Sequence, residues 1–153
     1  MLMREMNLSE YSEVINLIRS AVKNTCAGDY SESEINAWVP ENLDENRFIN
    51  SLTGCGNFVY TENGKIIGFI SIERDGYVNR LYVKYGSQNR GIGSALLKYA
   101  EKWAYEKGVR TIKLDSSKTA EGFYEKCGYI KSGVSVMQRG GVVFRNAVMK
   151  KNL

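Results

Sequence analysis

The sequence contains no histidine. Without an imidazole, Ser-His-Asp and Cys-His nucleophilic sites and histidine-ligated zinc sites are excluded. Any proton transfer must use a carboxylate, a tyrosine, a cysteine, a lysine or water. Cysteine is also scarce: Cys26, Cys55 and Cys127 are odd in number and far apart, so neither a disulfide framework nor a CxxC metal or redox pair is present in the sequence. We therefore expect no metal site and a reducing, cytoplasmic location.

Long apolar runs are missing as well. No stretch approaches the roughly 20 apolar residues of a membrane span, and residues 1–7 lack the apolar segment of a signal peptide. The charges, 21 Lys and Arg against 17 Asp and Glu, give a net charge of +4. This balance suits an anionic small molecule but lacks the basic cluster of a nucleic-acid-binding domain. We expect neither membrane nor nucleic acid as a partner.

What is present indicates one globular domain over residues 1–153, since the chain has ordinary composition, a single proline and no repeat or linker. Apolar periodicity and turn signals predict seven strands and five helices of an α/β protein with a mixed sheet. Glu101 and Lys102 are expected on the exposed face of the strongest helix, and Ser9 is expected to cap the first. The strands are predicted at 1–6, 58–60, 66–72, 77–83, 109–114, 129–136 and 142–149, and the helices from about 11, 31, 44, 92 and 119.

One segment, residues 81–97, runs from a strand through a glycine-containing loop into that strongest helix. Glycines let the backbone approach a ligand closely, and the positive end of a helix favours an anion. Gly91, Gly93 and Ser94 occupy this junction, and Arg90 adds a cation. The segment therefore predicts a phosphate-binding site.

Three kinds of phosphate loop compete for this segment. A dinucleotide fold needs G-x-G-x-x-G, but the third glycine is missing at Leu96, and we find no acidic residue ending a following parallel strand in a suitable βαβ unit. A P-loop needs Gly-Lys followed by Ser or Thr, but Gly64-Lys65 continues into Ile66. The remaining pattern, Gln88-x-x-Gly91-x-Gly93, resembles the pyrophosphate loop of the GNAT superfamily of acyl-CoA-dependent N-acyltransferases.

The resemblance extends over residues 57–149. It includes the strand before the loop (residues 80–83), the helix after it, and residues 117–129, which resemble the second CoA-contacting helix of that superfamily. Residues 1–55 and 139–145 are similar to its YafP-like branch. The resemblance implies a GNAT-like α/β fold with a mixed, mostly antiparallel central sheet flanked by helices.

The resemblance also implies contacts with acetyl-CoA as co-substrate. The backbone of Leu81, Tyr82 and Val83 would pair with the pantetheine amides, and Ser117 stands where the family often has an asparagine that reaches the pantetheine arm. The Val83 N–H would stabilise the oxyanion, and Tyr124 stands at the usual general-acid position. The residues expected around the pyrophosphate are Gln88, Asn89, Arg90, Gly91, Ile92, Gly93 and Ser94.

The proton acceptor is less clear from the resemblance. Some members place a glutamate early in the strand before the loop, and Tyr77 stands there in this chain. We expect Glu73, at the end of the preceding strand, to be the general base, with Asp75 as a weaker candidate and water as a further one. Tyr30 and Trp38 either wall the acceptor pocket or pack helices onto the sheet.

The function implied is transfer of an acetyl group from acetyl-CoA to a primary amine of a small molecule or peptide, by direct attack in a ternary complex. The alternative is a non-catalytic acyl-CoA-binding module with a regulatory or interaction role. Cys26 is expected to be either a reactive thiol near the acceptor pocket or a small buried hydrophobe. The last strands could also pair across a homodimer.

Overall fold

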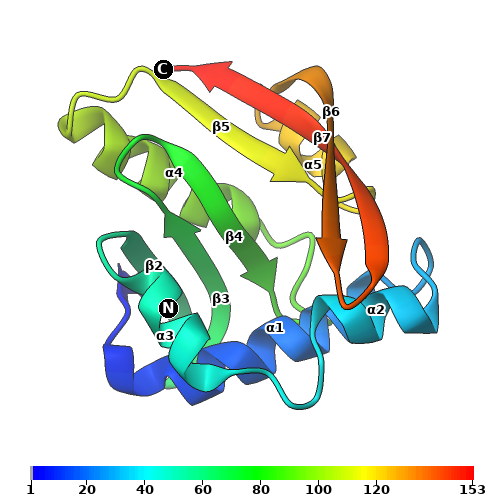
Figure 1. Ribbon diagram of the computed structural model, residues 1–153. Coiled ribbons are helices and arrows are strands. Elements are labelled where there is room, and N and C mark those ends of the chain that lie inside the picture. The colour runs from blue at the N-terminus through cyan, green and yellow to red at the C-terminus, as the bar shows by residue number, and fades with distance from the viewer. Residues whose placement is uncertain (1) are drawn as a thin grey trace.

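The computed structural model describes residues 2–153. Its seven strands form a single sheet in the order β1-β2-β3-β4-β5-β7-β6 (Figure 1). Neighbouring strands are antiparallel except for β4 and β5, which confirms the predicted mixed, mostly antiparallel sheet. The strands are β1 (Leu2–Glu5), β2 (Gly56–Glu62), β3 (Lys65–Ile72), β4 (Tyr77–Val83), β5 (Thr111–Ser116), β6 (Ile130–Arg139) and β7 (Val142–Asn152).

Helices cover both faces of the sheet (Figure 1). The core on one face contains Leu96 and Ala100 of α4 and Tyr124 of α5, whereas the other core contains Val14 of α1 and Phe48 of α3. The helices are α1 (Tyr11–Thr25), α2 (Glu32–Trp38), α3 (Glu45–Leu52), α4 (Ile92–Glu106) and α5 (Glu121–Lys126), with a 3₁₀ turn at Leu8–Glu10. No helix within residues 2–153 is long and apolar enough to cross a membrane.

Local signals explain most element boundaries. Ser31 and Glu34 form the predicted capping box of α2, with Ser31 N–H donating to Glu34 Oε1 at 2.8 Å. The β2–β3 hairpin turns at Asn63 and Gly64, both with positive φ, as an Asn-Gly turn requires. These features were readable from the sequence because each depends on neighbouring residues alone.

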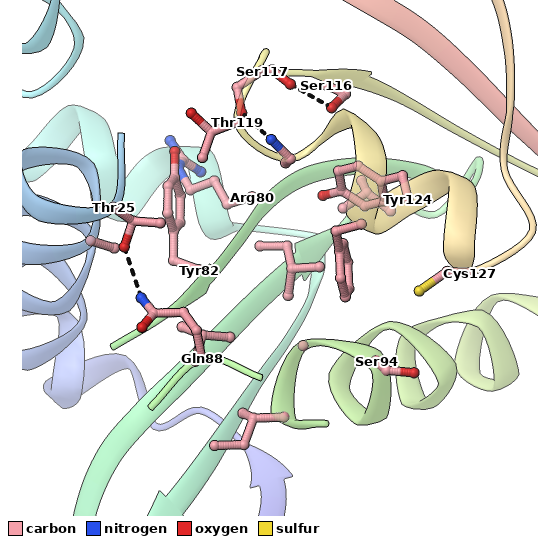
Figure 2. Close-up of a pocket in the computed structure, with 18 of the residues that line it drawn as sticks. Thr25, Arg80, Tyr82, Gln88, Ser94, Ser116, Ser117, Thr119, Tyr124 and Cys127 are labelled. Atoms are coloured by element: carbon pink, nitrogen blue, oxygen red, sulfur yellow. Dashed lines mark hydrogen bonds between the residues drawn. The ribbon is translucent and has the colours of Figure 1, made fainter. Parts of the chain in front are cut away.

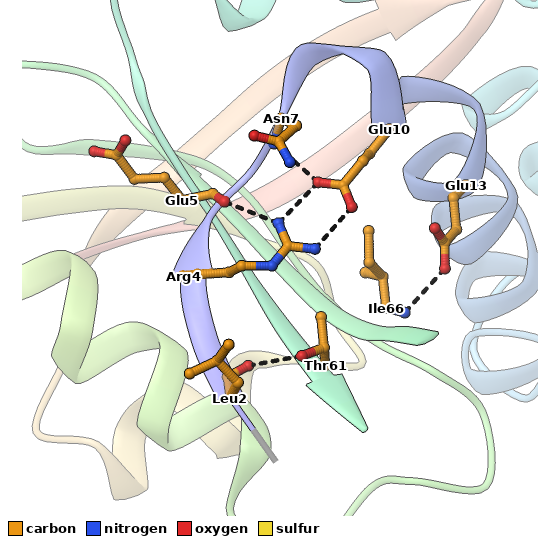
Figure 3. Close-up of polar contacts among 8 residues, drawn as sticks. All are labelled: Leu2, Arg4, Glu5, Asn7, Glu10, Glu13, Thr61 and Ile66. Atoms are coloured by element: carbon orange, nitrogen blue, oxygen red, sulfur yellow. Dashed lines mark hydrogen bonds and ion pairs between the residues drawn. The ribbon is translucent and has the colours of Figure 1, made fainter. Parts of the chain in front are cut away.

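The start of α1 differs from the prediction. Ser9 lies inside the 3₁₀ turn and does not cap the helix. Instead, Glu10 accepts a hydrogen bond from the Asn7 N–H at 2.9 Å, and Arg4 of β1 donates to both oxygens of Glu10 at 2.9 and 2.8 Å (Figure 3). The entry into α1 is therefore tied to the edge strand by a bidentate ion pair that local sequence rules do not reveal.

The expectation for Glu101 was wrong, whereas Lys102 is exposed as predicted. Glu101 is only 8% exposed and accepts hydrogen bonds from the Tyr129 hydroxyl at 2.7 Å and the Lys151 ammonium at 3.2 Å. Both partners come from the C-terminal part of the chain, which packs beside α4. A helical pattern shows only which face is polar, and here part of that face is covered by the end of the sheet.

The sheet splits between β4 and β5. These strands pair only at Tyr77 with Lys113 and at Val78 with Leu114. The β3–β4 register then shifts, with Ser71 opposite Arg80 and Ile72 opposite Val78, so Asn79 is an extra residue in β4. A bulge of this kind bends its strand. Beyond it, β4 diverges from β5, as Figure 1 shows.

Candidate active site

A cleft of about 720 Å³ opens where β4 and β5 diverge. It is bounded by β4, by the loop leading into α4, and by α5 (Figure 2). The cleft brings together every residue predicted to contact the co-substrate except Arg90, although these residues come from two separate sequence motifs. Those that line it are Leu81, Tyr82, Val83, Gln88, Asn89, Gly91, Ile92, Gly93, Ser94 and Ser117.

The free edge of β4 faces this cleft. Lys84 N–H donates to Ile67 O of β3 at 2.9 Å. Successive backbone N–H groups of a strand point to opposite sides, so the Val83 N–H points away from β3 and toward the cleft. No described strand pairs with β4 beyond Val78 on that side. The cleft edge therefore offers backbone donors and acceptors to an extended ligand.

The two glycines of the loop have different structural requirements. Gly91 is the N-cap of α4 with φ +79°, and a Cβ there would meet nothing within 4 Å. At Gly93, a Cβ would lie 3.2 Å from the Phe123 ring, so this glycine lets α5 pack closely on the start of α4. No side chain of the described residues caps the first turn of α4. Its N–H groups and positive helix end are thus available to an anion.

Two polar residues of the loop are already engaged within the protein. The Gln88 side-chain amide donates to Thr25 Oγ1 at 2.8 Å, as Figure 2 shows, and its oxygen accepts from Gly86 N–H at 2.8 Å. Arg90 forms an ion pair with Glu62 and does not line the cleft. Gln88 therefore holds the loop against α1, and pyrophosphate contact by either side chain stays a prediction.

Tyr124 lines the cleft from α5. Its ring makes edge contacts with Phe123 at 5.2 Å and Tyr129 at 5.7 Å between centroids. Burial, with a smaller contribution from nearby Tyr82, raises the pKa of Tyr124 well above its usual value. The raised pKa keeps the phenol neutral, so it retains its proton. Within residues 2–153 the hydroxyl has no hydrogen-bond partner, which leaves that proton available for donation into the cleft.

A second recess of about 480 Å³ adjoins the cleft. The residues that line both are Trp38, Asn79, Arg80, Tyr82, Asp115 and Ser117. Both predicted acceptor residues, Tyr30 and Trp38, line this recess. They also pack together at 5.3 Å between ring centroids, and Trp38 contacts Phe144 at 6.1 Å. The packing role is therefore observed, and the role of these residues in an acceptor pocket stays a prediction.

The acidic residues are distributed between the two spaces. Glu73 is exposed and lines the recess but not the cleft. Asp115 of β5 lines both, and it accepts hydrogen bonds from the Tyr77 hydroxyl at 2.6 Å and from Ser135 Oγ at 3.1 Å. Burial and the Asp115 hydrogen bond raise the pKa of Tyr77 well above its usual value.

Sequence reasoning missed Asp115. The expectation that no acidic residue ends a following parallel strand was wrong, because β5 is parallel to β4 and carries Asp115 one residue before its end. The predicted strand stopped at Leu114, two residues before the observed end at Ser116. The strand-helix-strand order around α4 was the signal that could have found it, since such a connection places two parallel strands side by side.

Cys26 also lines the cleft from the end of α1. Its side chain is buried, and burial raises the pKa of the thiol above its usual value. A neutral, buried thiol packs as a small hydrophobe. This environment favours the second of the two expectations for Cys26.

The fold and cleft define an acyl-CoA-dependent acetyltransferase of the GNAT type. Residues 26–153 match the Acetyltransferase (GNAT) domain family, and the chain belongs to that family. It is 30% identical over 142 residues to the uncharacterized N-acetyltransferase YafP of Escherichia coli K12, an alignment that covers 92% of this chain and 89% of that protein. This similarity confirms the resemblance to the YafP-like branch.

Solved structures show the same architecture. A GCN5-related N-acetyltransferase from Rhodopseudomonas palustris superposes with a TM-score of 0.95 at 26% identity, covering 99% of this chain and 95% of that one. The PaiA N-acetyltransferase of Thermoplasma acidophilum, in complex with coenzyme A, superposes with a TM-score of 0.78 at 25% identity, covering 99% and 98%. The GNAT-like fold predicted from the two motifs is confirmed.

Proposed function

We propose that this protein transfers an acetyl group from acetyl-CoA to a primary amine, by direct attack within a ternary complex. The observation that carries the proposal is the split between β4 and β5, which exposes an unpaired strand edge beside the uncapped N-terminus of α4. An extended thioester with a diphosphate fits such a site, because amide groups can pair with the strand while the anion lies at the helix end. The coenzyme A complex of the T. acidophilum protein supports the same ligand class.

In this proposal, the loop from Gln88 to Ser94 surrounds the pyrophosphate. Gly91 leaves open space next to the helix end, so phosphate oxygens can approach the backbone N–H groups. Leu81 and Val83 present backbone groups to the pantetheine arm, with Ser117 on the opposite wall of the cleft.

The transfer needs stabilisation of an oxyanion, protonation of the departing thiolate and removal of a proton from the amine nitrogen. The neutral amine attacks the thioester carbon, and the Val83 N–H is the donor proposed to stabilise the resulting oxyanion. Collapse of the intermediate breaks the C–S bond, and Tyr124 gives its proton to the departing thiolate. Glu73, directly or through water, takes the proton that the amine nitrogen loses. The products are an amide and CoA.

A titration of coenzyme A into the protein by calorimetry tests the binding step. We expect binding that Gly91→Trp abolishes, because the indole would fill the open space at the helix end. Gly86→Trp is the matched control: Gly86 also has a positive φ and nothing within 4 Å of its Cβ position, but it does not line the cleft. Absence of binding, or equal binding by both variants, would contradict the proposed site.

Thiol release from acetyl-CoA with a panel of amines tests the transfer step. Acceptor-dependent release supports the acetyltransferase, whereas binding without such release supports the alternative, a non-catalytic acyl-CoA-binding module.

The free cysteines Cys26, Cys55 and Cys127 suit the reducing cytoplasm that we propose as the location.

A homodimer is proposed through β6, the edge strand of the sheet beyond β7. Ile130, Val134 and Val136 of β6 are exposed apolar side chains beside unpaired backbone groups. Light scattering after size exclusion tests this proposal. A dimer that dissociates in Val134→Lys supports it, and a monomer at all concentrations contradicts it.

A further inference from the structure

Two arginines that line the second recess have no counter-ion among the described residues. Arg80 extends from β4 beside the bulge, with its guanidinium over the Phe48 ring at 4.9 Å from the centroid. Arg139 reaches the same recess from the end of β6. Within residues 2–153, neither guanidinium forms an ion pair or a side-chain hydrogen bond, whereas Arg4 and Arg90 both do.

Arg80 is half-buried, which makes the lack of a charged partner unfavourable. Burial lowers the pKa of Arg80, and the nearby charge of Arg139 lowers it as well. A guanidinium removed from water is normally paired with a carboxylate or phosphate, for which its planar fork is suited. The half-buried Arg80 and the exposed Arg139 both line this recess, and together they point to an anionic group on the molecule that enters it.

The acids of the recess do not neutralise these arginines. Both oxygens of Asp115 accept hydrogen bonds, from Tyr77 and Ser135, and Glu73 lies at the exposed rim. The recess thus presents cationic and anionic groups that are not joined in ion pairs. Such an arrangement suits a ligand that itself carries both charges.

The recess also has an aromatic side, next to the polar side chains of Ser51, Asn79, Ser117 and Asn146. Tyr30, Trp38 and Phe144 contact one another at 5.3 to 6.2 Å between ring centroids and form one wall. Aromatic walls bind apolar groups through contact area. A volume of about 480 Å³ is sufficient for a ligand of amino-acid size.

We propose that the acceptor is an amino-acid-like zwitterion: an amine that also carries a carboxylate, bound by Arg80 and Arg139, with an apolar body on the aromatic wall. This inference rests on the proposed function, because it assigns the substrate class of the same site. A polycationic amine is disfavoured, since its extra charges would lie against two unpaired guanidinium groups.

Matched pairs of amines with and without the carboxylate test the inference. Phenylalanine against phenethylamine and leucine against 3-methylbutylamine differ only in that group. Each is titrated by calorimetry into the protein saturated with coenzyme A. We expect at least one carboxylated member to bind about tenfold or more tightly than its partner, as a guanidinium–carboxylate contact provides.

Arginine variants assign the preference to the recess. We expect Arg139→Gln and Arg80→Gln to reduce it about tenfold while the binding of phenethylamine stays unchanged. Arg145→Gln is the control, because Arg145 is exposed on the same hairpin and lines neither cavity. Arg139 is itself exposed, so its variant remains informative if Arg80→Gln disturbs the fold.

The outcomes separate this inference from the proposed function. If no carboxylated member binds more tightly than its partner, or if the preference survives both arginine variants, the inference is overturned. Thiol release that favours the amines without a carboxylate also overturns it but leaves the acetyltransferase intact. A carboxylate preference in binding without thiol release for any amine supports the recognition site and contradicts acetyl transfer.

Discussion

Glu101 joins three parts of the fold through a buried polar network. It lies on α4, and its carboxylate accepts hydrogen bonds from the Tyr129 hydroxyl at 2.7 Å and from Lys151 of β7 at 3.2 Å. Tyr129 in turn packs against Tyr124, the proposed general acid. Removing the carboxylate should therefore lower the stability of the protein and loosen the position of Tyr124.

The size of the effect follows from the two contacts. A hydrogen bond to a charged group contributes about 1.5–3 kcal/mol. The Lys151 side chain retains 27% of its exposure, so its ion pair is screened and adds about 1 kcal/mol at most. We expect Glu101→Ala to lower the free energy of unfolding by about 3 kcal/mol. Glu101→Gln keeps an oxygen for the Tyr129 hydroxyl and should cost only about 1 kcal/mol.

Urea unfolding followed by circular dichroism measures these values. With a slope of about 2 kcal/mol per molar urea, the midpoint should fall by about 1.5 M for Glu101→Ala and about 0.5 M for Glu101→Gln. Glu106→Ala serves as the control, because Glu106 is exposed on the same helix. If Glu101→Ala unfolds no earlier than the control, or if both Glu101 variants lose the same stability, the network does not have the proposed role.

Four further predictions concern protonation and proton transfer. Burial and the hydrogen bond to Glu101 raise the pKa of Tyr129 above its ordinary value near 10. The stabilisation that neutral Tyr129 provides is therefore complete below pH 10 and is lost as the pH rises further. In Tyr129→Phe, the urea midpoint should decline less steeply over this pH range. The Arg4 hydrogen bond lowers the pKa of Glu10 below its ordinary value near 4.5, so stability is lost as the pH falls through that range. The loss should be less than about 1 kcal/mol, because the ion pair is partly exposed. A Glu10→Gln variant whose stability has the same acid dependence would contradict this prediction. Tyr124→Phe should lower kcat by about a hundredfold or more and leave the Kd of coenzyme A unchanged, and equal kcat values would exclude the acid role. Glu73→Gln should lose most activity at low pH, where fewer amines are neutral, so a pH profile that does not move would indicate water or another base.

The cleft illustrates which parts of the site could be predicted from the sequence. Gly91 belongs to a short motif, and its requirement for a positive φ is local, whereas the close contact of Gly93 is a tertiary one with Phe123 of α5. The strands and helices could also be predicted, because hydrophobic periodicity indicates which side chains face a core. The family was therefore readable from the residues alone, and so was the set of residues that line the cleft proposed for the co-substrate.

The recess proposed to bind the acceptor was decided by the tertiary structure. Arg80, Asp115 and Arg139 lie on three different strands, and they meet because β5 is parallel to β4 and the β6–β7 hairpin folds back beside it. Glu101 was misjudged for a related reason, as its partners lie 28 and 50 residues away. Pairing between distant segments depends on strand order and register, which no local pattern specifies.

The absence of histidine is the clearest chemical constraint that the sequence imposes by itself. It limits the proton carriers of this protein to carboxylates, tyrosines and a few other groups, whatever the fold. Which of them face the cleft is settled only by folding: Tyr124 lines it between two aromatic rings, Asp115 lines it and is held by Tyr77 and Ser135, and the exposed Glu73 lines only the neighbouring recess. Composition determines which chemistry is available, whereas packing determines which groups lie close enough to carry it out.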